Sequence, residues 1–375
     1  MTEHHDALEG LNKQISLHDK IIAAHKSVSE VFPFIVRIAV ALYDPETKIL
    51  KTYLHSSGDD NPLDHYQTLL DDAPSLKDIL DKGLPRVANN LLTFEDGKHE
   101  HTQRIGRQGY AASYTLPMFN NGTFIGFIFF NSDAKDVFTE TVLRQIDIYA
   151  HMISLTIINE LTSIHTLTAA VKTTGSITHI RDPETGSHLD RMSRYSRLIA
   201  TSLADKYNLD DAYIEHIFMF SPLHDIGKIG IPDNILLKPD KLDNDERDVM
   251  NTHARKGREM IDELLKNFGL ENIEYKNMLR NIAEFHHEAV NGSGYPAGKK
   301  GNEIPIEARI VAVADVFDAL TSARPYKEAW SNHRAIQTIK ELSGETLDQD
   351  CVNALIKNIG KIEKIQQQFN ENTYG

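Results

Sequence analysis

Residues 284–296 of the chain read EFHHEAVNGSGYP, with two adjacent histidines directly before a turn that contains two glycines and a proline. On a helix, neighbouring side chains point about 100° apart, so His286 and His287 cannot both face one apolar core. From about residue 175 onward, helical periods with polar connections dominate and strand signals nearly vanish. The stretch therefore belongs to a predicted all-α domain over 175–375, in which the paired histidines require a chemical explanation.

The composition indicates a folded protein of two domains. Its 375 residues, 25% of them charged, exceed the ~250–300 residues that one core usually supports. Neither a signal-peptide pattern nor a run of ~20 apolar residues is present, so we expect a cytoplasmic chain without a membrane partner. The formal net charge of −14 argues against polymeric nucleic acid as a partner, and the single cysteine, Cys351, excludes a disulfide framework and a cysteine-rich zinc site.

The first part of the chain alternates helix and hairpin signals. Helical spacing over 5–30 predicts an N-terminal helix within 1–30, and helical spacing recurs over 64–82. Two β-rich hairpins are predicted at 32–58, around the turn DPET, and at 109–133. This order of elements predicts an α+β domain.

The second of these hairpins carries a family resemblance. Its turn is Asn121-Gly122, a strong hairpin signal. The stretch LPMFNNGTFIGFIFFNS (116–132) resembles the closing strands of a GAF domain. The resemblance implies a GAF-like sensor domain over 31–150, with a ligand that the sequence does not identify.

A long helix over 139–174 joins the two domains and carries an apolar stripe. The apolar residues recur at three- and four-residue steps, as in a coiled coil. They are Val142, Ile146, Tyr149, Ile153, Ile157, Leu161, Ile164 and Val171. The helix either packs on its own domain or forms a dimer interface that carries a signal between the domains. The second interpretation is favoured by its place between two domains of different class, and it predicts a homodimer.

Imidazole and carboxylate side chains recur in five segments of the second domain. They are Glu184 and His188, His224 and Asp225, His253, His286 and His287, and Asp315. Taken singly, an isolated histidine is usually a surface or satisfied core residue, and Glu184 could be an ordinary first-turn carboxylate. Asp315 differs because it lies inside the apolar helix IVAVADVFDAL, where a buried carboxylate needs a metal ion or a positive side chain.

Together these residues predict a metal cluster. Ligands without thiolate suit iron, manganese, cobalt, nickel or zinc, and eight ligands exceed what one tetrahedral zinc needs. We therefore expect two or three divalent metal ions, with Asp225 bridging through its two oxygens. Two metals ~3.5–4 Å apart can hold a bridging hydroxide and clamp both the attacking and the leaving oxygen of a phosphoryl displacement. Such a cluster is typical of phosphoester hydrolysis.

The second domain contains four motifs, PETGSHLDRMSRYSRLIA (183–200), HDIGKIGIP (224–232), HHEAVNGSGYP (286–296) and ADVFDALTSARPYK (314–327). Together they resemble the signature of HD-GYP domains, a branch of the HD metal-dependent phosphohydrolases. The resemblance covers roughly 175–340. It implies an all-α fold and hydrolysis of cyclic di-GMP to linear pGpG, in some members onward to GMP.

The same resemblance assigns the metal ligands. It implies that they are His188, His224, Asp225, His253, His286, His287 and Asp315. Glu184 matches an extra carboxylate that helps to hold a third metal in some members. Iron is the expected metal, and manganese is the alternative. Glu288 is not expected to be a ligand, because the set is complete without it.

The resemblance also indicates cations for the substrate. Arg324 and Lys327 match the family's phosphate-binding pair, although Arg324 could instead pair with a helix acid. Lys228 lies one turn after Asp225. It is predicted either to contact the phosphate or the leaving oxygen, or to form a structural salt bridge.

Three further residues complete the predicted substrate side. Asp318 is expected either to orient Lys228 or a ligand histidine, or to lie exposed at the surface. Gly294 allows close approach of the backbone to a ligand. Tyr295 is expected either to stack on a guanine or bond a phosphate, or only to fill the loop.

The sequence thus predicts a cyclic di-GMP phosphodiesterase regulated by a sensor domain. In the expected mechanism a metal-bridging hydroxide attacks phosphorus, and the catalytic residues are His224, Asp225 and Lys228. Two alternatives stay open. One is a non-catalytic effector that binds cyclic di-GMP, and the other is a hydrolase of another cyclic dinucleotide such as cyclic GMP-AMP.

Overall fold

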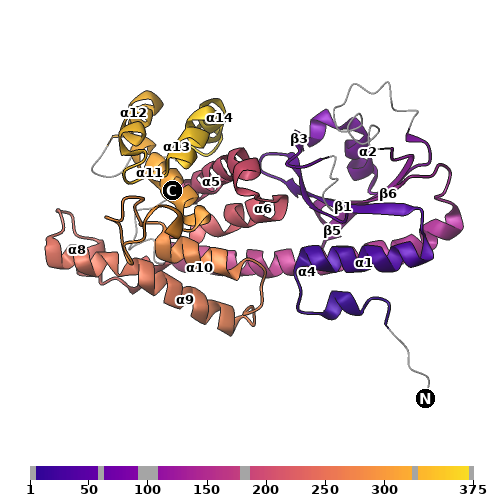
Figure 1. The fold of residues 1–375 in the computed structure, drawn as a ribbon, viewed down its shortest axis with the longest axis horizontal. Helices are drawn as coiled ribbons and strands as arrows, with labels where there is room; N and C mark the ends of the chain where they lie inside the picture. The colour runs from indigo at the N-terminus through magenta and orange to yellow at the C-terminus, as the bar shows by residue number, and fades with distance from the viewer. Residues whose placement is uncertain (1–5, 58–62, 92–108, 178–185, 323–327, 371–375) are drawn as a thin grey trace, which may run out of the picture. The chain divides into compact units, whose positions relative to one another are not determined.

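Figure 1 shows the computed structural model of the chain, which describes residues 6–57, 63–91, 109–177, 186–322 and 328–370. The chain divides into two compact units, Met1–Thr162 and Ser163–Gly375. The border between the units falls inside one long helix, α4 (Glu140–Ile177). The domain bounds expected from the sequence stay a prediction, and each unit is considered by itself below.

In the described part of the first unit, six strands form one antiparallel sheet in the order β3-β2-β1-β6-β5-β4. The strands are β1 (Ile35–Asp44), β2 (Ile49–His55), β3 (Gln67–Leu69), β4 (Arg86–Ala88), β5 (Ala112–Asn120) and β6 (Thr123–Ser132). The short strand β4 has no counterpart among the predicted elements. Both predicted hairpins are present, and together with the helices of this unit they confirm its α+β class.

The turns of the two hairpins follow directly from their residues. In the first, Asp44 Oδ1 accepts hydrogen bonds from the backbone N–H groups of Glu46 at 3.0 Å and Thr47 at 3.4 Å. Aspartate commonly closes a turn in this way. In the second, Asn121 and Gly122 have φ angles of 48° and 82°. Two positive φ angles are what a two-residue hairpin turn requires.

The first helices are shorter than the sequence predicts. The predicted helix over 5–30 consists of a 3-10 turn, η1 (Glu9–Asn12), and a separate helix, α1 (Leu17–Val31). Ser16 accounts for the late start, because its hydroxyl accepts from the Asp19 N–H at 3.0 Å and so caps α1. The predicted helix over 64–82 is also too long. There β3 and η2 (Leu70–Asp72) come first, and α2 (Pro74–Lys82) begins at a proline.

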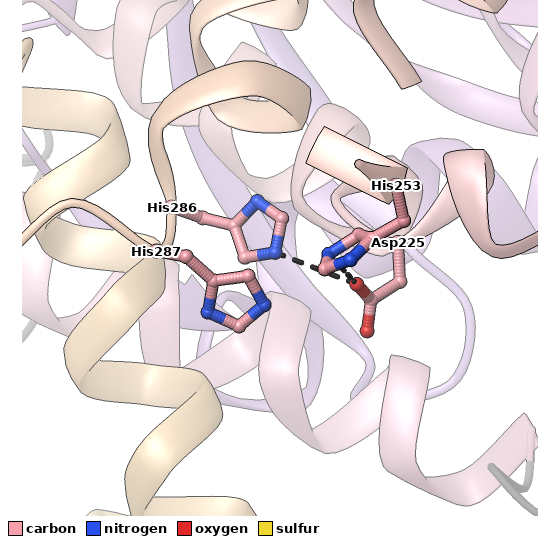
Figure 2. Close-up of side chains that lie close together, drawn as sticks. All are labelled: Asp225, His253, His286 and His287. Atoms are coloured by element: carbon pink, nitrogen blue, oxygen red, sulfur yellow. Dashed lines mark ion pairs between the residues drawn. The ribbon is translucent and has the colours of Figure 1, made fainter. Parts of the chain in front are cut away.

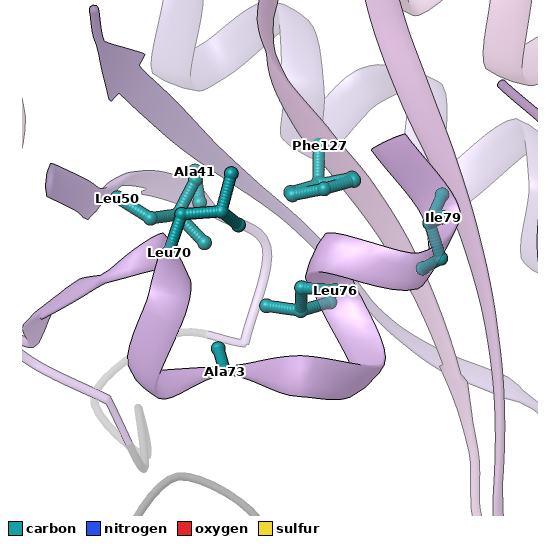
Figure 3. Packing of buried hydrophobic residues seen from close by; sticks show 7 residues of the cluster. All are labelled: Ala41, Leu50, Leu70, Ala73, Leu76, Ile79 and Phe127. Atoms are coloured by element: carbon teal, nitrogen blue, oxygen red, sulfur yellow. The ribbon is translucent and has the colours of Figure 1, made fainter. Parts of the chain in front are cut away.

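One face of the sheet is covered by α2. Figure 3 shows Leu76 and Ile79 of α2 near Phe127 of β6, with Ala41 of β1 beside Leu50 and Leu70 in the same cluster. Ala41 and Phe127 are paired across the two strands, so their side chains share that face. Burying side chains of this size contributes about 1.5–3 kcal/mol each. The cluster therefore anchors α2 to the sheet.

The apolar stripe on α4 is buried by the chain itself. Ile146, Ile153, Ile157 and Ile164 are at most 1% exposed. The side chain of Asp147 accepts from the Tyr114 hydroxyl of β5, which ties the helix to the sheet. These four side chains are therefore packed within the chain, which favours the first interpretation for them, and the predicted homodimer stays a prediction. The side chain of Val171 lies outside the described residues.

The described residues of the second unit are helical, as predicted, with one isolated bridge between Ser343 and Leu347. The elements are α5 (Gly186–Tyr207), α6 (Asp211–Phe220), η4 (Ser221–Leu223), η5 (Ile226–Gly230), α7 (Asp233–Leu236), α8 (Asn244–Asn251), α9 (His253–Asn267), α10 (Lys276–Phe285), η6 (Gly301–Glu303), α11 (Ile306–Thr321), α12 (Asn332–Leu342), α13 (Gln349–Lys357) and α14 (Ile359–Gln368). In neither unit does a helix of the described ranges have the length and apolar character that crossing a membrane demands.

Candidate metal centre

Within the described ranges, two groups of histidines and carboxylates place their ligand atoms within 4.8 Å of one another. The first group is Asp225, His253, His286 and His287, and the second is His188, His224 and Asp315. The residues come from α5, the segment between η4 and η5, the start of α9, the end of α10 and the middle of α11. The structure thus brings together seven of the eight predicted ligands, from five separate places in the second unit.

Asp225 lies between the two groups and turns one carboxylate oxygen to each. Its Oδ1 lies 3.2 Å from His253 Nε2 and 3.4 Å from His286 Nε2, as the dashed lines in Figure 2 indicate. Its Oδ2 lies 3.2 Å from His224 Nε2. Asp315 belongs to the second group, with Oδ1 4.0 Å from the Nε2 atoms of His188 and His224. A carboxylate that turns one oxygen to each group of histidines, as Asp225 does, is suited to bridge two cations.

The histidine rings are held from behind through Nδ1. The acceptors are the backbone oxygens of Ser221 for His224 at 2.9 Å, Met250 for His253 at 2.8 Å and Ile282 for His286 at 2.9 Å, and the Asp318 carboxylate for His188 at 2.8 Å. Carbonyl and carboxylate oxygens can only accept, so Nδ1 carries the proton in each ring. The lone pair of a neutral ring is then on Nε2, which faces the centre. This is how proteins orient histidines toward metals.

The electrostatics of the first group favour the protonation states that bind metals. Burial lowers the pKa of His286, and it lowers the pKa of His287 well below the usual range, so both rings are neutral. Burial alone would raise the pKa of Asp225, but the nearby charge of Lys228 opposes this effect, and the pKa of Asp225 lies well below its usual range. Neutral imidazoles around an ionised carboxylate fit divalent cations of the first transition series.

Two glycines let the backbone bring Asp225 to His253. A Cβ on Gly227 would lie 1.9 Å from the His253 carbonyl oxygen and 2.4 Å from the Gly257 nitrogen. Only a residue without a side chain permits this approach of η5 to α9. The glycines are visible in the motifs HDIGKIGIP and HARKG, but nothing in the sequence indicates that Gly227 and Gly257 contact each other.

The paired histidines of 284–296 both reach the centre because the helix ends there. The last residue of α10 is Phe285, and His286 is its C-cap. The centroids of the His286 and His287 rings are 4.0 Å apart, and Figure 2 shows both rings on the side of Asp225. On a regular helix the two side chains would point about 100° apart. Because the helix ends at Phe285, both rings can turn toward the same centre.

The loop after the histidines folds back onto them. The Tyr295 ring lies 4.8 Å from the His287 ring with an interplanar angle of 34°. A Cβ on Gly294 would lie 2.3 Å from the Ala289 nitrogen. Glu288, which the sequence does not predict as a ligand, accepts from the backbone N–H groups of Ala297 at 2.7 Å and Lys299 at 2.9 Å. Its carboxylate closes the loop, a role that sequence reasoning missed.

Asp318 is completely buried, which excludes the predicted surface position. Besides His188, it receives two hydrogen bonds from Arg191, from Nε at 2.7 Å and from a terminal nitrogen at 2.9 Å. Arg191 also donates to the Ser322 hydroxyl at 2.7 Å. With no exposed surface, Asp318 supports His188 and does not form a wall for substrate. Arg191 was missed by sequence reasoning, although it lies one turn after His188 on the same helix.

Of the remaining predicted site residues, Lys228 lies in the described part of the chain and three others do not. The Lys228 ammonium lies 2.8 Å from Asp225 Oδ2, so the salt bridge predicted as one of its two roles is present. Glu184, Arg324 and Lys327 lie outside the described residues. Ser322, the last described residue before the segment that holds Arg324 and Lys327, is bound to both Arg191 and Asp318.

Comparison with known proteins confirms the predicted HD domain, because residues 183–351 match the HD domain family. The chain is 46% identical over 189 residues to the cyclic di-GMP phosphodiesterase response regulator RpfG of Xanthomonas campestris pv. campestris, covering 50% of this chain and 47% of that protein. It is 42% identical over 205 residues to a probable cyclic di-GMP phosphodiesterase of Vibrio cholerae, covering 54% and 46%. It is 32% identical over 246 residues to 3'3'-cGAMP-specific phosphodiesterase 2 of Vibrio cholerae, covering 62% and 45%. The chain therefore spans less than half the length of each of these three relatives.

Among solved structures, GAF domains are similar to this chain. The GAF domain of an Acinetobacter phosphoenolpyruvate-protein phosphotransferase has 15% identity and a TM-score of 0.32, covering 42% of this chain and 90% of that one. The phycoerythrobilin-bound GAF domain of a cyanobacterial phytochrome has 14% identity and a TM-score of 0.31, covering 40% and 89%. Scores of this size identify no ligand for the first unit.

Proposed function

Because residues 183–351 form an HD domain, we propose that this chain is a metal-dependent phosphodiesterase that hydrolyses cyclic di-GMP to linear pGpG. One observation carries the proposal. Histidine rings fixed through Nδ1 turn their Nε2 atoms toward the two oxygens of Asp225. The names of the relatives from Xanthomonas and Vibrio support the choice of substrate.

The two groups of side chains would each hold one metal ion. His253, His286, His287 and Asp225 Oδ1 form one ligand set, and His188, His224, Asp315 and Asp225 Oδ2 form the other. Glu184 would add a ligand for a third ion. Imidazole and carboxylate ligands suit several divalent metals, and the resemblance to HD-GYP domains favours iron, with manganese as the alternative. Bound divalent metals lower the pKa of water and draw negative charge from phosphate oxygens, which is the chemistry that phosphodiester hydrolysis needs.

The chain's own residues bind and orient the substrate around this centre. Asp225 is ionised and presents one carboxylate oxygen to each group of histidines. Lys228 lies 2.8 Å from Asp225 Oδ2 and would give a proton or a hydrogen bond to the leaving ribose oxygen. Arg324 and Lys327 would neutralise the phosphate oxygens. Tyr295, packed on His287, would form the wall on which a guanine stacks.

A second substrate has a specific observation in its favour. A relative that is 32% identical is named a 3'3'-cGAMP-specific phosphodiesterase. We therefore pair metal analysis of anaerobically purified protein with turnover of cyclic di-GMP and of 3'3'-cGAMP, followed by chromatography of the products. Two or more metal ions per chain and pGpG as the first product are expected. Faster turnover of 3'3'-cGAMP would identify the alternative substrate, and binding of cyclic di-GMP without turnover would identify the non-catalytic effector.

We further propose that the first unit regulates hydrolysis through α4 in a homodimer of the cytoplasm. The buried stripe does not serve this purpose, but a neighbouring face of α4 does. Ile148, Met152 and Leu155 are 62%, 38% and 66% exposed and follow the four- and three-residue spacing of a coiled coil. Light scattering of the full chain tests this surface. Leu155→Glu is expected to shift a dimer to a monomer, whereas Lys82→Glu, an exposed change on α2, is not.

A further inference from the structure

The helix α14 ends beside the residues that support the metal ligand His188. Phe369 is the C-cap of this helix. It lies beyond residues 183–351, the part of the chain that matches the HD domain family. We propose that Phe369 is a positioning residue of the metal centre, which acts on His188 through Arg191 and Asp318. This rests on the proposed function, because it takes the cluster of histidines and carboxylates to be a metal site.

A continuous series of hydrogen bonds links Phe369 to the ring of His188. The carboxylate of Asp318, which binds His188 Nδ1 at 2.8 Å, accepts from Arg191 at 2.7 and 2.9 Å. The other terminal nitrogen of Arg191 donates to the backbone carbonyl oxygen of Phe369 at 3.0 Å. Because a guanidinium is planar and rigid, a hydrogen bond at one nitrogen fixes the direction of the others. The position of the Phe369 carbonyl therefore helps to orient Asp318 and, through it, the ring of the metal ligand.

The ring of Phe369 is held by a second arginine of α5. The guanidinium carbon of Arg194 lies 3.8 Å from the centre of the Phe369 ring and 5.6 Å from the centre of the Phe218 ring of α6. A guanidinium over an aromatic face is a favourable contact, and it is stronger where water is excluded. Arg194 is 7% exposed. Next along the chain, the carbonyl oxygen of Asn370 accepts from the Ser187 hydroxyl at 3.4 Å. The segment after α14 is thus attached to α5, the helix that carries the metal ligand.

The helix α14 is anchored independently of the Phe369 ring. Its residue Ile362 is completely buried. The side-chain amides of Gln366 and Asn332 exchange two hydrogen bonds, at 2.8 and 3.0 Å. Asn332 is the first residue of α12. A buried apolar side chain and a reciprocal amide pair both hold the helix in place, so loss of the Phe369 ring should not detach it. A change at Phe369 therefore tests the support of the metal ligand more than the fold.

A purely structural role for Phe369 would have a different consequence. If the ring only covered apolar surface, its loss would lower the free energy of unfolding and leave the metal affinity of the folded protein unchanged. If the ring positions His188, the folded protein should bind one ion more weakly. Only one of the two ligand groups in the described ranges contains His188. The ion held by the other group should keep its affinity, so the two roles are distinguished by which ion is affected.

Calorimetric titration of the metal-free full chain with Mn²⁺ tests the proposal. Removing a direct partner of a metal-bound histidine usually costs about 10–100-fold in affinity. Phe369 is two steps further away, so Phe369→Ala is expected to weaken binding of one ion by about three- to tenfold and to leave the other unchanged. Phe369→Tyr keeps the aromatic ring and should bind both ions as the wild type does. Gln367→Ala, an exposed change on the same helix, should also leave both affinities unchanged.

The possible results separate this proposal from the proposed function. Circular dichroism reports the folding of each variant. If Phe369→Ala does not fold, Phe369→Leu decides, because it keeps an apolar side chain but lacks the aromatic face; it should weaken one ion by about threefold. Wild-type affinity for both ions in the folded variant overturns the proposal, and so does an equal loss at both ions. Binding of Mn²⁺ by the wild type without turnover of cyclic di-GMP would contradict the proposed function alone, and no binding of Mn²⁺ by the wild type would overturn both.

Discussion

The metal centre and a cavity of the first unit, whose lining includes Arg37 and Arg86, bury polar groups in different ways. At the metal centre, each ring that hydrogen-bonds through Nδ1 is already fixed, and only the inward nitrogen is left for a ligand. In the cavity, Arg37 donates to the Asn131 amide oxygen at 3.2 Å and Arg86 donates to the Thr115 hydroxyl at 3.4 Å. The metal centre thus directs lone pairs from several helices to a common point, whereas the cavity directs N–H donors to acceptors of neighbouring strands. Burial of polar groups alone therefore does not identify a metal site, and their convergence does.

Asp225→Asn should be the most severe change at the point of convergence. The amide keeps the shape but removes the negative charge that both histidine groups face. We expect hydrolysis to fall by about 1000-fold or more, because an ionised group of the reaction centre is lost. Metal content should fall as well. Assays of turnover and metal content on one preparation check this result.

The matched control for this variant is Asp245→Asn, an exposed carboxylate in the first turn of α8. It should keep full activity and metal content. Turnover by Asp225→Asn at the level of this control, with metals restored, would contradict the proposed centre.

The two regions also differ in how far the sequence predicts them. The metal centre is readable because histidines beside aspartate and within short motifs are chemically distinctive. Asp315 is also readable, because a carboxylate inside an apolar helix needs a partner and so marks a ligand. The cavity is not readable, because Arg37 and Arg86 meet only through the pairing of four strands. Register of this kind depends on contacts that are distant in the chain.

The same reason limits the prediction of the fold. The stripe on α4 is visible in the sequence, but a stripe does not say which surface covers it. The predicted helices over 5–30 and 64–82 are too long because local signals at Ser16 and Pro74 start the helices later. Arg191 and Glu288 were missed because an arginine on a helix and a glutamate just after a helix end are both ordinary. Their functions follow from partners that lie far away in the sequence or in a loop.

Gly227→Ala tests the packing that assembles the metal centre and has no equivalent in the cavity. The new methyl group would lie 1.9 Å from the His253 carbonyl oxygen, so η5 and α9 must move apart. We expect a loss of about 3 kcal/mol in the free energy of unfolding. Chemical denaturation measures it, and metal content should fall in parallel.

Gly360→Ala is the matched control, since nothing lies within 4 Å of the added methyl group on α14. It should raise the free energy of unfolding by about 0.5–1 kcal/mol, because alanine favours a helix. Equal effects of the two changes would show that the contact between η5 and α9 does not hold the centre together.

His216 provides a reference for the metal-centre histidines, because it is as deeply buried but belongs to neither group. Burial lowers its pKa to about 4, below the 6.5 of an unfolded chain. Its contribution to stability is therefore complete above pH 6.5 and is lost as the pH falls toward 4, because the unfolded chain takes up the proton first. The loss should reach about 3 kcal/mol. Urea denaturation of the wild type and His216→Gln across this range measures the difference between them, and parallel curves would refute the assignment.

Asp318→Asn probes the support behind one metal ligand and should have the smallest effect of these changes. The amide oxygen can still accept from His188 Nδ1, but the charge that holds Arg191 and orients the ring is lost. Metal affinity or activity should fall about 10–100-fold, the usual cost of removing a partner of a metal-bound histidine. Titration with metal should restore much of the turnover at an unchanged KM, which simple unfolding would not allow. Arg191→Lys keeps the positive charge but loses the paired hydrogen bonds, so its effect should be smaller. If Asp318→Asn binds metal as tightly as the wild type, the orientation of His188 is set by packing alone. The metal centre would then resemble the cavity, where the register of the strands sets the positions of the side chains.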